Sequence, residues 1–213
     1  MVLRRRGYAL RGALKLVGDR YQLSERQRTA LKRATSEAAT VAARLAARVP
    51  SGAAPPADLW VDGFNVLITC ETALRGGVLV STVDGGLRDL SGIHGTYRTS
   101  AVTTEALERI AATLEERGWG AVPTRWLLDA PVSNSGRLAA RIRELAEADA
   151  RPWRVDVVRD PDPVLQQAPP GVVVASGDAP VIDRCAAWID LGAEAARGCA
   201  AAWIVDLGVA TAS

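Results

Sequence analysis

Cysteine and histidine are scarce in this chain of 213 residues. The three cysteines, Cys70, Cys185 and Cys199, stand far apart and form no Cys-x-x-Cys pair. This spacing argues against a disulfide framework and against a zinc site with the usual ligand spacing. Reduced, buried thiols are the simpler interpretation, so we expect a cytoplasmic protein. The only histidine is His94.

Long apolar runs are also missing. No stretch of about 18 or more apolar residues occurs, so we predict no transmembrane helix and no membrane partner. The beginning of the chain is basic like a signal peptide, but Arg11 and Lys15 interrupt its apolar stretch. An amphipathic basic helix is the better interpretation. The phosphate-binding loop Gly-x-x-x-x-Gly-Lys-Ser/Thr is absent as well, which argues against a nucleotide cofactor.

Charge is distributed unevenly, although the net charge is only +2. Residues 1–48 hold 12 Lys and Arg against three acids, a net charge of +9, and the remainder of the chain carries −7. A basic segment attracts polyanions, and an acidic body suits the binding of cations. We therefore expect nucleic acid as a partner. A solvated basic face, or the contact surface of a homodimer, remains an alternative for this segment.

The basic segment, residues 1–48, has helical periodicity with a break at 18–23. Ser24 follows the break as a good N-cap, and Gln27 completes a capping box. We therefore predict two helices joined by a short turn. Residues 49–57 contain three prolines and small residues, which is typical of a linker.

From residue 58 to 213, short apolar runs alternate with helical patterns. Strands are predicted to end near Asp62 and to span 124–130, 153–158, 171–178 and 201–207, with helices at 102–117, 135–149 and 180–196. The strands are apolar along their whole length, as expected when helices cover both faces of a parallel sheet. This order predicts an α/β sandwich. Residues 76–100 do not fit the rhythm, and we interpret them as a functional loop.

Three of the predicted strands end in aspartate: Asp62, Asp129 and Asp178. Ligands of an open parallel sheet bind beyond the carboxyl ends of its strands, so these side chains are expected to converge. Convergent carboxylates repel each other unless a cation neutralises them. Oxygen ligands favour a hard ion, so we predict that these three residues bind Mg²⁺ or Mn²⁺.

Two further polar residues accompany this set. Asn65 follows Asp62 by three positions, and Gly63 between them permits close backbone approach. Asn65 is either part of the site or the cap of the following helix. Asp183 lies one turn into the helix that follows Asp178, either as a ligand or as a favourable charge at the helix N-terminus.

Candidate phosphate-binding residues lie in two loops. Ser133, Asn134 and Arg137 surround the start of a predicted helix, where they either bind phosphate or simply cap the helix. In the 76–100 loop, Arg98 is a candidate to stabilise developing charge, and His94 either protonates the leaving oxygen or is structural.

The motifs VDGFNVLIT, LRDLSGIHGTYR, LLDAPVSNSGR and SGDAPVIDR together resemble a prokaryotic family, the domain of unknown function 434. The back part of such proteins resembles the PIN and NYN ribonuclease superfamily. The resemblance implies a PIN-like three-layer α/β/α sandwich with a mainly parallel sheet. It implies a metal-dependent nuclease, a ribonuclease rather than a deoxyribonuclease.

By that resemblance, five residues fall on metal-site positions: Asp62, Asn65, Asp129, Asp178 and Asp183. The four aspartates are the implied catalytic residues. The chain departs from the superfamily pattern at Ala179-Pro180, which intervenes before Asp183. The alternative is therefore a catalytically weak or inactive module that binds RNA or another protein.

Overall fold

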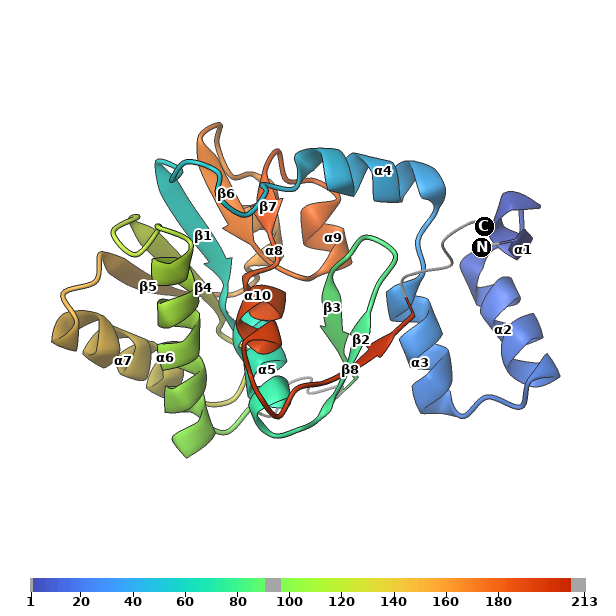
Figure 1. Cartoon of the computed structure of the whole chain (residues 1–213), viewed down its shortest axis with the longest axis horizontal. Helices are drawn as coiled ribbons and strands as arrows, with labels where there is room; N and C mark the ends of the chain where they lie inside the picture. The colour runs from blue at the N-terminus through green and yellow to red at the C-terminus, as the bar shows by residue number, and fades with distance from the viewer. Residues whose placement is uncertain (1, 91–96, 208–213) are drawn as a thin grey trace.

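A five-stranded parallel sheet forms the centre of the protein in the computed structural model, which describes residues 2–90 and 97–207 (Figure 1). Its strand order is β5-β4-β1-β6-β7. The strands are β1 (Asp58–Asp62), β4 (Thr124–Asp129), β5 (Trp153–Val158), β6 (Val172–Ala175) and β7 (Trp188–Ile189). The first four match predicted strands. All pairs in this sheet are parallel, as their continuous apolar sequences predict.

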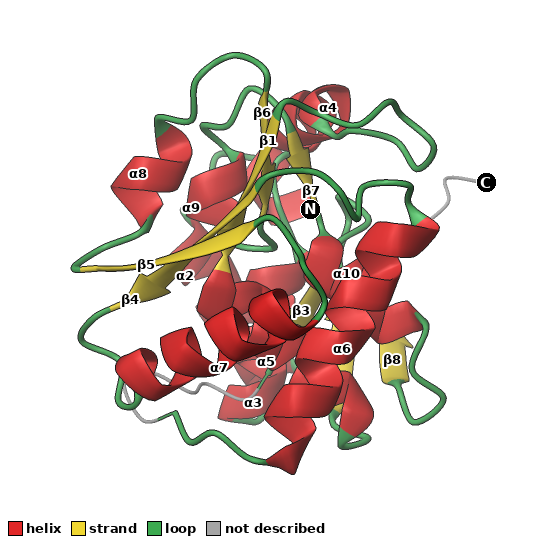
Figure 2. Ribbon diagram, turned by 90° about the vertical axis from the view of Figure 1, so that its left-hand side faces the viewer, coloured by secondary structure: helices red, strands yellow, loops and turns green. Residues whose placement is uncertain are grey.

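Helices cover both faces of this sheet. One face is covered by α5 (Gly63–Leu74), α6 (Ala101–Glu116), α7 (Ser135–Ala148) and α10 (Leu191–Arg197). The other face is covered by α4 (Ala38–Ala47), α8 (Asp162–Gln166) and α9 (Ala179–Ile182). In Figure 2, α8 and α9 lie on one side of β1 and β6, and α6 and α10 lie on the other. The predicted three-layer α/β/α sandwich is therefore confirmed.

A second, smaller sheet lies beside the first and corrects two predictions. Its strands are β2 (Val78–Ser81), β3 (Leu87–Asp89) and β8 (Trp203–Asp206), in the order β3-β2-β8. The predicted loop 76–100 therefore contains an antiparallel pair of strands. The predicted strand 201–207 exists, but it pairs with β2 and not with the main sheet. Leu79 and Leu87 pack there against α5 and α10, so this hairpin has an apolar face of its own.

The predicted helix 180–196 is divided in two. Strand β7 interrupts it, and Asp190 then begins α10 as an N-cap whose side chain accepts a hydrogen bond from the backbone N–H of Ala193 (3.0 Å). The apolar pair Trp188 and Ile189 is fully buried at the edge of the sheet. Because this pair is buried against β6, it forms a strand instead of continuing the helix, and the Asp190 cap then begins α10.

The basic segment contains four helices instead of two. They are α1 (Val2–Arg5), α2 (Leu10–Arg20), α3 (Glu25–Ala34) and α4. The break before Ser24 and the capping box between Ser24 and Gln27 are confirmed. A second break at Thr35, which has an extended backbone, lets α4 turn back across α9 (Figure 1).

Residues 49–57, the predicted linker, lie against the body of the protein. Arg48 forms an isolated parallel bridge with Trp188, and the N–H of Val49 donates to the carbonyl of Trp188 (2.9 Å). The side chain of Arg117 donates to the Val49 and Pro50 carbonyls. The segment thus covers the free edge of β7. In the described part of the chain, no helix combines the length and apolar character needed to cross a membrane.

Candidate active site

A cavity of about 570 Å³ opens at the carboxyl edge of the main sheet. Five aspartates line it: four that follow strands of this sheet, Asp62, Asp129, Asp162 and Asp178, and Asp89, which ends β3 and pairs with Arg33. Asp62 ends β1 and is the N-cap of α5, and Asp129 ends β4. Asp178 follows β6 as the N-cap of α9, and Asp162 begins α8 after β5. The three predicted carboxylates therefore do share one cavity, as the rule for parallel sheets requires.

Asp62 is the most deeply placed of the four, with 5% of its surface exposed. Its Oδ2 accepts a hydrogen bond from the hydroxyl of Ser176 (2.7 Å), which in turn accepts from the N–H of Asp178 (2.9 Å). Glycine is required next to Asp62, because a Cβ at Gly63 would lie 3.0 Å from the carbonyl of Leu127. The predicted close backbone approach is therefore confirmed.

Asn65 belongs to the same cluster, but it is not the helix cap. Asp62 holds the cap position, and Asn65 lies in the first turn of α5, where it lines the cavity. Its Oδ1 accepts a hydrogen bond from the N–H of Gly177 (2.7 Å). Asn65 and Ser176 together therefore fix the turn that presents Asp178.

Burial and mutual repulsion keep these carboxylates from ionising easily. Burial, together with the negative charges of Asp178, Asp162 and Asp129, raises the pKa of Asp62 to about 7, against a lowering effect of the Ser176 hydrogen bond. Burial and the charges of Asp178, Asp160 and Asp129 raise the pKa of Asp162 to about 6. Burial also raises the pKa of Asp129 and Asp178. Such a cluster is stabilised when a cation binds.

Replacing Ser176 with alanine tests this hydrogen-bonded arrangement. The variant leaves the N–H of Asp178 without its acceptor and Asp62 without its donor, so we expect a loss of about 1–3 kcal/mol in unfolding free energy. Urea unfolding followed by circular dichroism measures the loss. Ser51→Ala, at an exposed position, is the matched control. Equal stability of the two variants contradicts the arrangement.

The cavity suits a divalent ion only in part. Among residues 2–90 and 97–207, no three Asp, Glu, His or Cys side chains gather closely enough to hold an ion between them. Mg²⁺ usually keeps several waters and needs only one or two carboxylates from the protein. The shared cavity and the raised pKa values therefore fit a hydrated ion better than a fully enclosed one.

Asp183 is not part of this cavity, which corrects its predicted place. Its two carboxylate oxygens accept from Nε and Nη2 of Arg44 at 2.6 and 2.9 Å. Arg44 is 5% exposed and also donates to Asp84 (2.6 Å). The residues Ala179-Pro180 begin α9 and carry Asp183 to its end, where it faces α4. Arg44, paired with Asp183 and Asp84, therefore anchors the basic segment to the body of the protein.

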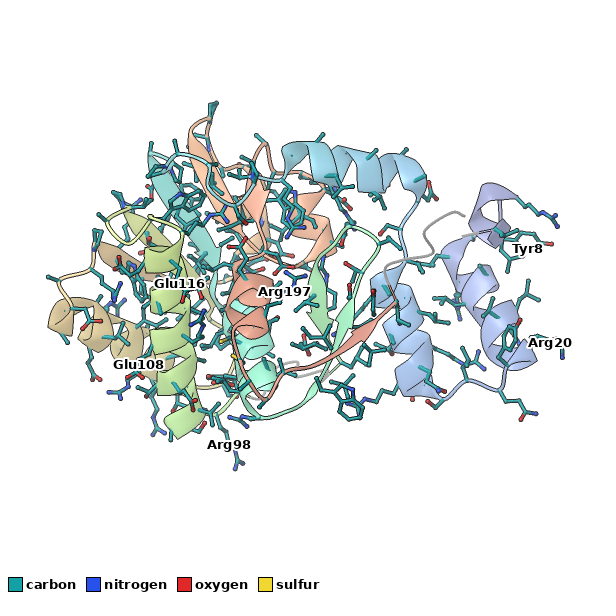
Figure 3. The ribbon with its side chains drawn as sticks, in the orientation of Figure 1. Tyr8, Arg20, Arg98, Glu108, Glu116 and Arg197 are labelled. Carbon is teal, nitrogen blue, oxygen red and sulfur yellow. The ribbon has the colours of Figure 1, made fainter. Side chains whose placement is uncertain are left out.

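The predicted phosphate-binding residues are dispersed. Asn134 is the N-cap of α7 in the left-handed conformation (φ 64°), and its amide donates to the carbonyl of Tyr97 (2.7 Å). Ser133 is exposed beside it, and Arg137 lines a second cavity, between α6 and α7. Arg98 is exposed and projects outward below α6 (Figure 3). His94 lies outside the described residues.

Several residues that line the cavity were not predicted from the sequence, among them Asp162, Arg88, Lys32 and Arg33. Asp162 had a usable signal, because it follows β5 within four residues and so lies at the same edge of the sheet. No comparable sequence signal pointed to the three basic residues. Arg88 is placed by its pairing with Asp190, and Lys32 and Arg33 arrive with α3, far away in the sequence.

Comparison with known proteins matches two ranges of the chain to different families. Residues 54–194 match the model of a family described as a domain of unknown function (DUF5616), and residues 2–46 match a protein of unknown function (DUF434). Uncharacterized protein MJ0935 of Methanocaldococcus jannaschii is 30% identical over 192 residues, which cover 89% of each chain. No solved structure matches. The chain therefore belongs to the DUF5616 family, with a DUF434 segment in front of that domain.

Proposed function

We propose that this protein is a metal-dependent phosphodiesterase that acts on nucleic acid, RNA rather than DNA. The observation that carries the proposal is the convergence of Asp62, Asp129, Asp162 and Asp178 in one cavity at the carboxyl edge of the sheet. The preference for RNA rests on the resemblance of the sequence motifs to PIN and NYN ribonucleases. The free thiols of Cys70, Cys185 and Cys199 support a cytoplasmic location.

In this proposal, different residues of the cavity have different roles. Asp62, Asp129, Asp162 and Asp178 would hold Mg²⁺ or Mn²⁺, which supplies Lewis-acid activation of water and neutralises phosphate charge. Ser176 orients the carboxylate of Asp62, and Asn65 holds the turn before Asp178. Phe64, Ile68 and Val132 add apolar side chains to the lining of the cavity.

Cleavage of labelled single-stranded RNA with Mn²⁺ tests the proposal. We expect Asp62→Asn to lower the cleavage rate by about a hundredfold or more, because the variant removes the most buried carboxylate of a charge-stabilising site. Asp58→Asn is the matched control, since Asp58 lies at the opposite end of the same strand and pairs with Arg154. Equal cleavage by wild type and Asp62→Asn ends the catalytic claim.

A binding module without catalysis is the second candidate. This candidate is favoured because, among the described residues, no three Asp, Glu, His or Cys side chains lie close enough to bind one metal ion together. Titration with Mn²⁺ by calorimetry separates the two functions. Binding that disappears in Asp62→Asn and persists in Asp58→Asn supports the enzyme, whereas RNA binding without any Mn²⁺ affinity supports the module.

A further inference from the structure

Three cations line the same cavity as Asp62, Asp129, Asp162 and Asp178. Lys32 and Arg33 come from α3 of the basic segment, and Arg88 comes from β3 of the small sheet. Arg33 is fixed to the end of β3, where it donates to the carbonyl of Asp89 and pairs with its carboxylate at 3.6 Å. The basic segment is therefore one wall of the cavity.

Arg88 is buried, with 8% of its surface exposed, yet it does not use all its donors. Its Nη1 donates to the carbonyl of Leu87 (2.9 Å) and to the carboxylate of Asp190 (3.2 Å). Its Nη2 lies 3.7 Å from Asp84 and has no hydrogen-bond partner among the described residues. An unsatisfied buried guanidinium donor is costly, and an oxyanion is the partner that guanidinium geometry favours.

The cavity is electrically polarised. The positive charges of Arg88, Arg33 and Arg44 act on Asp178 and favour its ionised form, although burial raises its pKa overall. The charges that act on Asp162 are those of Asp178, Asp160 and Asp129, all negative. Cations therefore lie on the Asp178 side of the cavity, and carboxylates dominate around Asp162.

We propose that Lys32, Arg33 and Arg88 form an anion subsite that binds a phosphate group of a nucleic-acid strand beside the carboxylate cluster. Arg88 supplies a fixed guanidinium, held by Asp190, and Lys32 supplies an exposed, adaptable charge. That the bound phosphate belongs to a nucleic acid rests on the proposed function, but the binding of an anion at this subsite needs no metal. A small phosphate ester would need only this subsite, whereas a strand places further phosphate groups beyond it.

Salt-dependent RNA binding by the full chain in EDTA tests the subsite. The probe is a fluorescein-labelled single-stranded RNA hexamer, and the readout is anisotropy over a series of KCl concentrations. Each lost phosphate contact lowers the slope of log affinity against log salt by about 0.7 for a single strand. We expect a decrease of about 0.7 for Lys32→Gln and roughly 1.4 for Lys32→Gln with Arg33→Gln.

Arg26→Gln is the matched control, because Arg26 is an exposed cation of the same helix that lines a different cavity. Its slope is expected to stay close to wild type. An unchanged slope in the double variant overturns the subsite, and so does an equal decrease in Arg26→Gln, which would indicate a diffuse basic surface. Lys32→Gln alone changes only an exposed side chain, so its result does not depend on refolding.

The two proposals fail separately. If the slopes change as expected but wild-type protein never cleaves RNA with Mn²⁺, the subsite stands and the nuclease fails. If Mn²⁺-dependent cleavage occurs but the slopes do not change, the nuclease stands and the subsite fails. Mn²⁺ affinity of the double variant should equal or exceed that of wild type, because the removed charges are positive.

Discussion

Arg44→Met is expected to destabilise the protein by about 3–5 kcal/mol, because it leaves a buried carboxylate without its main positive partner. Asp84 is 1% exposed, and its Oδ2 lies 2.6 Å from Nη1 of Arg44. The remaining cation, Arg88, is 3.7 Å away and is shared with Asp190. The free energy of unfolding in urea, measured at pH 7.5, gives the loss.

Two companion variants show which partner matters. Asp183→Asn should cost about 1 kcal/mol or less, since the side chain of Asp183 is 38% exposed and water screens its pairing. Adding Asp84→Asn to Arg44→Met should recover part of the lost stability, because no unpaired buried charge then remains. A loss below about 1 kcal/mol in Arg44→Met contradicts the assignment of Arg44 as the anchor of the basic segment.

Asp62→Asn is expected to stabilise the metal-free protein at pH 8 while it removes the proposed activity. The folded pKa of Asp62 is about 7, above its ordinary value of 3.8, so the folded state binds the proton more tightly than the unfolded state does. Wild-type stability therefore falls as pH rises from about 4 to 7, where the folded protein must give up this proton. A shift of this size corresponds to about 4 kcal/mol at pH 8.

Thermal unfolding in EDTA between pH 4 and pH 8 measures this effect. The two proteins should be about equally stable near pH 4, and the variant should gain over wild type as pH rises. Asp58→Asn serves as control and should follow the wild-type profile. A variant that is less stable than wild type at pH 8 contradicts the repulsion among Asp62, Asp129, Asp162 and Asp178 on which the site rests.

The main sheet and its cluster of aspartates followed from local sequence. Runs such as Thr124–Asp129 are apolar on both faces, and a following Asp is placed by the strand itself. The same rule applied one connection further would have included Asp162. Asp183 was assigned by its distance from Asp178 along the chain, and sequence distance does not show that Arg44, 139 positions away, binds it.

The small sheet and the cationic wall could not be predicted in the same way. β2 has only four residues, and it pairs with β8, which lies more than 120 positions later. The strength of that pairing depends on apolar contacts of Leu79 and Leu87 with helices α5 and α10, which local patterns do not contain. The place of Lys32 depends in turn on the break at Thr35, which turns α3 towards the small sheet.

The covered edge of β7 has a consequence for the protein's behaviour in concentrated solution. An exposed, apolar edge strand offers unpaired backbone groups to other chains and promotes intermolecular sheet growth. In this protein, the backbone of Arg48 and Val49 pairs with the backbone of Trp188 at this edge. A proteolytic cut within 49–57 that released the basic segment would therefore expose this edge, and the remaining body would tend to aggregate.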